Sequence, residues 1–145
     1  MASFDETLPA FGSEDWDMWL RIARNYPIHF VNEPLTLYRI HGYNTSLDRM
    51  CLSAEAVLQK LFSDPTLPAN IFRKKEEAYA RLYLSLSETY LKTNQKLKAI
   101  DYWQHALRIC PKMLWITNRA IWAGLKILLP YTVISNLPKL RLKLQ

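Results

Sequence analysis

The 145-residue chain has little of what would place it in several common classes. With three glycines and two cysteines, it is neither a low-complexity chain nor a disulfide framework. Its longest uncharged stretch, residues 127–138, has 12 residues with a proline inside, whereas a membrane-spanning helix needs about 20. The opening SFDETLPAFGSED is acidic and polar, unlike a secretory signal peptide. We therefore expect one ordinary domain or two small ones in the reducing cytoplasm, with both thiols buried and no zinc site.

Acidic residues are absent from the last part of the chain. Residues 112–145 contain six lysines and arginines and no acid, whereas residues 1–111 contain 13 basic and 13 acidic residues. The net charge of +6 therefore describes a basic tail and not a basic domain, so a nucleic-acid partner is not expected.

The tail, residues 114–145, is also apolar. Trp122, Leu125, residues 127–129 and Tyr131 lie beside Arg119 and Lys126. This pattern suits an amphipathic element in peripheral contact with the anionic inner face of a membrane. A helix that completes an α-helical core is the open alternative.

Periodicity predicts a mainly α chain with a short, incomplete α/β segment at its start, residues 1–48. There we expect a helix that begins at the acids and ends before Pro27, with Trp16, Trp19, Leu20 and Ala23 as the packed stripe. Short strands are expected at residues 28–31 and 35–41. One helix and two short strands cannot close a stable sheet alone. Residues 49–69 are expected to form a helix and a proline-containing linker, and residues 70–113 a helical hairpin interrupted at residues 93–95.

The hairpin contains a spacing of small and aromatic residues at Tyr83, Leu86, Ser87, Tyr90, Ala99, Trp103, Ala106 and Pro111. Residues 80–113 therefore resemble one repeat of the tetratricopeptide family, in which small residues let two antiparallel helices approach closely. Such a repeat needs stacked neighbours. It would act as a groove for a peptide or protein partner, or only as a helical cap, and both alternatives stay open.

A second set of motifs covers residues 3 to about 50. Phe-Asp-Glu stands at residues 4–6, Ser-Glu-Asp at 13–15 and Trp-Asp-Met-Trp-Leu at 16–20. Glu-Pro-Leu follows at residues 33–35 and Tyr-Arg-Ile-His-Gly-Tyr-Asn-Thr-Ser at 38–46. In order and spacing these motifs resemble the C-terminal part of the catalytic domain of family-two glycosyltransferases, which have the GT-A fold.

The resemblance implies sugar transfer from a nucleotide-sugar to an acceptor hydroxyl of a glycan or a lipid-linked acceptor, with inversion. Asp15 would be the general base, and Glu14 would position the acceptor or hold its loop. His41 would contact a divalent metal, Mn²⁺ or Mg²⁺, or the diphosphate, with Arg39 as a second donor to the departing diphosphate. Each residue also has an ordinary alternative: Asp15 as a helix-start acid, His41 as a hydrogen-bonding group at a strand end, and Arg39 as the partner of a local acid.

The chain also departs from the family pattern. No Asp-x-Asp precedes Asp15, and the Asp15-Trp16-Asp17 sequence lies inside the helix start and is not that metal motif. The donor-binding half would be truncated away or supplied by another polypeptide. We therefore expect this chain to be inactive alone and to hold no cofactor by itself. The competing hypothesis is a non-enzymatic helical adaptor that binds a protein partner.

Overall fold

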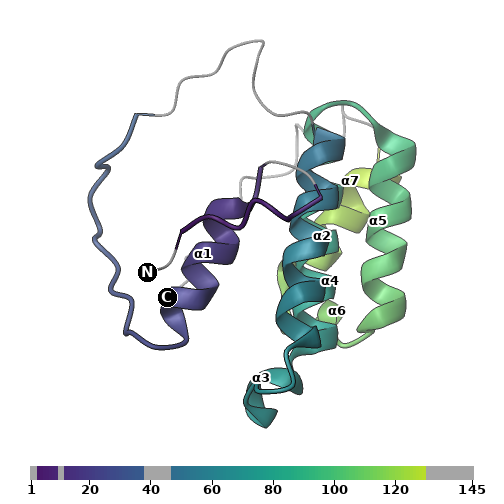
Figure 1. The fold of residues 1–145 in the computed structure, drawn as a ribbon. Helices are drawn as coiled ribbons and strands as arrows, with labels where there is room; N and C mark the ends of the chain where they lie inside the picture. Colours follow the sequence, from purple (N-terminus) through teal and green to yellow (C-terminus); the bar gives the residue numbers. More distant parts are fainter. Residues whose placement is uncertain (1–2, 10–11, 38–46, 130–145) are drawn as a thin grey trace. The chain divides into compact units, whose positions relative to one another are not determined.

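The computed structural model describes residues 3–9, 12–37 and 47–129 (Figure 1). These residues form seven helices and no strand, so the described chain is mainly α, as predicted. It divides into two compact units, Met1–Phe72 and Arg73–Gln145. The division differs from the expected boundaries, because the helix after residue 48 belongs to the first unit and the residues after 113 belong to the second.

The first unit contains helices α1 (Glu14–Ala23), α2 (Leu47–Ser63) and α3 (Ala69–Phe72). Helix α1 has three acids in its first turn and Arg21 in its last turn, an arrangement that the helix dipole stabilises at both ends. Helix α2 buries five apolar side chains: Cys51, Ala54, Val57, Leu58 and Phe62.

The expected short strands do not form in the described residues. Residues 28–31 and Leu35 to Leu37 have no strand structure, and the remainder of the second expected strand, residues 38–41, lies outside the described residues. Phe30 is 87% exposed and Leu35 is 71% exposed. A strand needs a hydrogen-bonded neighbour to be stable, and the described chain provides none. The described residues therefore do not show the expected short α/β segment.

The second unit is built on two helices, α4 (Lys75–Lys92) and α5 (Lys96–Ile109), which form an antiparallel hairpin (Figure 1). The turn falls at the expected interruption. Asn94 has a positive φ of 59°, a conformation that asparagine tolerates. The Asn94 amide donates to the Leu91 carbonyl and the Gln95 amide to the Tyr90 carbonyl, at 3.1 and 2.8 Å. These two bonds form a Schellman motif, which ends α4 and reverses the chain.

Two shorter helices, α6 (Met113–Ile116) and α7 (Asn118–Leu128), complete the second unit. Ala120, Ala123, Gly124 and Ile127 of α7 are buried. This stretch of the predicted tail therefore completes a helical core, the alternative left open above, while Tyr131 lies outside the described residues. In the part of the chain that the structure describes, no helix is long and apolar enough to cross a membrane.

Close packing in the second unit depends on small residues. Ala80, Ala99, Ala106 and Ala120 are fully buried. The Ser87 hydroxyl donates to the Ala99 carbonyl across the hairpin at 2.8 Å. The Trp103 indole N–H donates to the Ala120 carbonyl at 2.8 Å, and a Cβ added at Gly124 would lie 2.8 Å from the same indole ring. The absence of a side chain at Gly124 thus lets the Trp103 ring lie against α7.

Both cysteines are free and buried, as the sequence predicted. Cys51 belongs to α2 of the first unit, and Cys110 lies at the end of α5 in the second.

Candidate functional site

The three acids at the start of α1 have three different environments. The Asp15 side chain is exposed, and its Oδ1 accepts a hydrogen bond from the Trp16 amide at 2.7 Å. Glu14 is half-buried, and its Oε2 accepts from the Gly12 amide at 2.6 Å. Asp17 is buried, at 4% exposure. Of these three carboxylates, the one that an external molecule can reach most directly is therefore that of Asp15.

Glu14 holds the turn that precedes the helix. Hydrogen bonds from its own amide and from the Gly12 amide lower the pKa of its carboxyl, so Glu14 is ionised at neutral pH. Gly12 has a φ of 137°, a conformation that a residue with a Cβ rarely adopts. The Glu14 carboxylate thus fixes the backbone of the turn that precedes Asp15.

Asp17 is held by two cations. Arg21 donates from Nε at 2.9 Å, one helical turn further along α1, and Lys60 of α2 lies with Nζ 2.8 Å away. Lys60 also contacts Asp5 at 2.7 Å. Burial lowers the pKa of Lys60, but its bonds to Asp17 and Asp5 outweigh burial and raise it overall. Asp17 and Lys60 therefore tie α1 to α2 and to the opening residues of the chain.

This ion-pair network corrects the expected packing of α1. The tryptophan stripe is not the buried face: Trp16 is half-buried, while Trp19 and Ala23 are exposed. The side chain buried most deeply in α1 is Asp17. Its spacing of four residues from Arg21 is a sequence signal for a local ion pair. No comparable signal links Asp17 to Lys60, which is 43 residues further along the chain.

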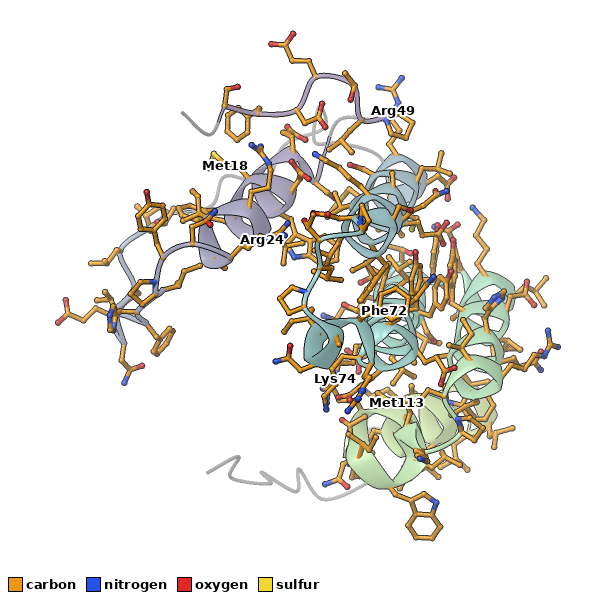
Figure 2. The ribbon with its side chains drawn as sticks, turned by 60° about the horizontal axis from the view of Figure 1, so that its bottom comes forward. Met18, Arg24, Arg49, Phe72, Lys74 and Met113 are labelled. Atoms are coloured by element: carbon orange, nitrogen blue, oxygen red, sulfur yellow. The ribbon has the colours of Figure 1, made fainter. Side chains whose placement is uncertain are left out.

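A cavity of about 260 Å³ lies between α1 and α2 within the first unit. Its apolar lining comes from Leu20, Val57 and Leu61, and its charged lining from Asp17, Arg21, Arg24, Lys60 and Asp64. Arg24, at the end of α1 (Figure 2), donates to the Asp64 carboxylate and to the Thr66 carbonyl. The charged groups around the cavity are thus bonded to one another. Their main role is to hold α1 and α2 together.

The remaining predicted site residues are not placed. Arg39 and His41, which the resemblance assigns to the diphosphate and the metal, lie outside the described residues. Among the described residues, no group of three or more histidines, cysteines or acids could hold a metal ion. Asp15 and Asp17 do not fit a metal site, because Asp17 is bonded to Arg21 and Lys60.

Comparison of the chain with protein-family models, with curated proteins and with solved structures gives no match. Its function is therefore proposed from its own residues and their geometry.

Proposed function

We propose that the first unit is the acceptor side of an inverting family-two glycosyltransferase, with Asp15 as its general base. One observation carries the proposal: Asp15 is the exposed member of the three acids, while its neighbours are engaged in holding the structure. In the motif order that the chain shares with this family, Asp15 is also the residue at the position of the base.

The reaction follows from an accessible carboxylate. The oxygen of the acceptor hydroxyl attacks the anomeric carbon of the donor sugar while its proton passes to a carboxylate oxygen of Asp15. The bond between that carbon and the nucleoside diphosphate breaks, and the diphosphate leaves with the electron pair. Glu14 keeps the preceding turn in place through the Gly12 amide. Asp17 does not take part, because its oxygens are bonded to Arg21 and Lys60.

The exposed apolar stretch at residues 28–37 supports the same proposal. It contains the Glu-Pro-Leu motif and exposes Ile28, Phe30, Val31, Leu35 and Leu37. In a complete GT-A domain such residues would form strands at the end of a sheet, paired with strands that are not present among the described residues. We propose that the donor-binding half is supplied by other polypeptide, and that this chain has no transferase activity by itself.

The proposal is tested on a joined chain. The genomic DNA immediately upstream of the Met1 codon is read, and any in-frame segment with alternating strands and helices and an Asp-x-Asp is expressed together with residues 1–145. Nucleotide-sugar hydrolysis and transfer are then measured. We expect Asp15→Asn to lower turnover by roughly 10²-fold or more, the contribution of a general base, with little change in thermal stability.

The matched control is Asp101→Asn, because Asp101 is an exposed acid of α5 in the second unit. It should leave turnover unchanged. Turnover that survives Asp15→Asn would remove Asp15 as the base. If no such frame is found upstream or in a neighbouring gene, the transferase proposal is overturned, because no donor-binding half would be available to Asp15.

A second candidate function belongs to the second unit: a cytoplasmic, non-enzymatic adaptor that binds a protein through its tetratricopeptide-like hairpin. The buried Ala99 and Ala106 and the half-buried Trp103 occupy the positions that this repeat requires. An open hollow of about 330 Å³ is lined by Trp103, Gln104, Leu107 and Arg108. A photo-crosslinker at Gln104, followed by binding measurements with the purified captured protein, would favour the adaptor. Activity of the joined chain would favour the enzyme.

A further inference from the structure

Helix α6 places a tryptophan in solvent. Its first residue, Met113, is fully buried in the core cluster with Ala80, Cys110 and Ala120. The other three residues, Leu114, Trp115 and Ile116, are exposed, and Trp115 is 90% exposed. Because α6 is a single turn fixed by Met113, the outward position of the other three side chains is a property of the fold.

The next turn of chain fixes this arrangement from the other side. The Thr117 side chain caps α7 by accepting from the Arg119 amide at 3.2 Å. The Ala120 carbonyl is in turn bonded to Trp103 at 2.8 Å. Residues on both sides of Leu114, Trp115 and Ile116 are thus anchored, and these three side chains form a small apolar tip.

The end of the second unit that carries this tip is basic. Because α4 and α5 are antiparallel, the first turn of α4 lies beside the last turn of α5. Ala80, Cys110 and Met113 belong to one buried cluster at this end. Lys74 and Met113 accordingly lie at the same end in Figure 2. The exposed cations near these termini are Arg73, Lys74, Lys75, Arg108 and Lys112, against the two acids Glu76 and Glu77. Glu77 is already bonded to Lys74 and Arg81. From Tyr102 to Leu129 the chain has no acid.

We propose that this basic end binds an anionic lipid surface, with Trp115 inserted at the level of the headgroups. Tryptophan favours that depth, because its ring is apolar and its N–H can still find a polar partner. The surrounding lysines and arginines would be attracted to anionic lipid over about a Debye length. A stable protein interface buries about 800 Å² on each partner, far more than three side chains provide, whereas a membrane needs only a short apolar wedge.

This surface differs from the one that the sequence suggested. Of the tail residues expected to face lipid, Ile127 is buried, Trp122 and Leu125 are half-buried against the helical core, and Leu128 is exposed. In the present proposal the main lipid-facing side chain is Trp115, which lies one turn before α7. The proposal concerns the second unit and does not depend on the transferase proposed for the first.

Vesicle binding of the full chain tests the proposal. The chain is mixed with vesicles of phosphatidylcholine alone or of phosphatidylcholine with phosphatidylglycerol, and binding is followed by flotation. Quenching of tryptophan fluorescence by brominated lipid reports insertion. We expect binding to the anionic vesicles only, weakened by salt. Trp115→Ala should lower the affinity by roughly tenfold or more and remove most of the quenching. Lys112→Glu should lower the affinity by a factor of about five for each unit of charge changed.

The matched control is Trp19→Ala, since Trp19 is also an exposed tryptophan but belongs to the first unit. It should bind anionic vesicles as the unchanged chain does. Trp115 is so exposed that its replacement should leave the helical circular dichroism unchanged, which excludes unfolding as the cause of a loss. The proposal is overturned if the full chain does not bind the anionic vesicles. Wild-type affinity of Trp115→Ala would also overturn it, because the binding would then depend on other residues.

Discussion

The interactions inside the first unit of this chain differ in kind from those inside the second. In the first unit, ion pairs link α1, α2 and the residues next to them: Asp17 with Lys60, Lys60 with Asp5, and Arg24 with Asp64. In the second, a cluster of buried alanines, Leu84, Cys110 and Met113 is covered by Tyr83, Trp103 and Leu107. An ion pair between Arg119 of α7 and Glu88 of α4 accompanies this apolar core. The first unit also leaves a run of apolar side chains between residues 28 and 37 in solvent.

This difference affects whether each unit can fold stably by itself. Apolar burial is the dominant favourable contribution to folding, and the second unit achieves it with residues that are close in sequence. Ion pairs contribute little at the surface and carry a desolvation cost when buried. A unit that exposes a run of apolar side chains is what the end of a larger domain would look like by itself. This inference agrees with the proposed transferase.

The largest effect should come from the core of the second unit. Leu84 is 1% exposed and belongs to the core cluster, so Leu84→Ala should lower the free energy of unfolding of this unit by about 3 kcal/mol, because it removes buried methyl groups and leaves a cavity. Hydrogen exchange of the α4 and α5 amides, read by mass spectrometry, measures the change. Leu97→Ala is the control, since Leu97 is largely exposed and should change exchange little. Equal effects of the two variants would contradict the assigned core.

A smaller effect is expected when the ion-pair network of the first unit is broken. Asp17→Asn leaves Lys60 and Arg21 without their shared carboxylate. It should lower the free energy of unfolding of the first unit by about 2 kcal/mol. Faster hydrogen exchange should be confined to α1 and α2.

Asp15→Asn serves as the control for this stability measurement, because the same substitution is made two residues away on an exposed side chain. Lys60→Met supplies the matching change on α2. If Asp17 and Lys60 act as a pair, the double variant should be less destabilised than the sum of the two single variants. Strict additivity would show that the pair is not coupled.

The helices of both units were largely predictable from the sequence, whereas the strands expected in the first unit do not form in the described residues. Small and aromatic residues at Ala99, Trp103 and Ala106 indicated two closely packed helices, and Asn94 lies in the turn between them. These signals are local. The expected strand at residues 28–31 failed because strand formation depends on a neighbouring strand, about which a single segment contains no information.

The candidate site was predicted only in part. The sequence pattern predicted Asp15 in the first turn of a helix, and the structure confirms this position. The exposure of its side chain was not predicted. The role of Asp17 was missed, because an acid in the first turn has an ordinary explanation in the helix dipole. Its second partner, Lys60, comes from another helix, and such long-range pairing cannot be obtained from the spacing of residues within α1. Trp115 was missed for a related reason: its exposure depends on how Met113 packs.

The smallest predicted effect concerns acid and the Asp64 contact. A hydrogen bond from the Thr66 hydroxyl, a second from the Thr66 amide and a third from Arg24 lower the pKa of Asp64 from 3.8 to about 2. Because the folded-state pKa lies below the unfolded value, the ionised carboxylate stabilises the fold. That stabilisation is fully present above the unfolded value and is lost as the pH falls through about 2.

Carbon-detected NMR titration of Asp64 measures this pKa directly. Thr66→Val should raise it toward the ordinary value, and by more than Arg24→Gln does, because the Thr66 hydroxyl is the largest cause of the shift. A larger rise with Arg24→Gln would mean that the ion pair between Arg24 and Asp64 dominates this contact. The first unit would then depend on charge even at its surface, and the contrast with the second unit would be sharper.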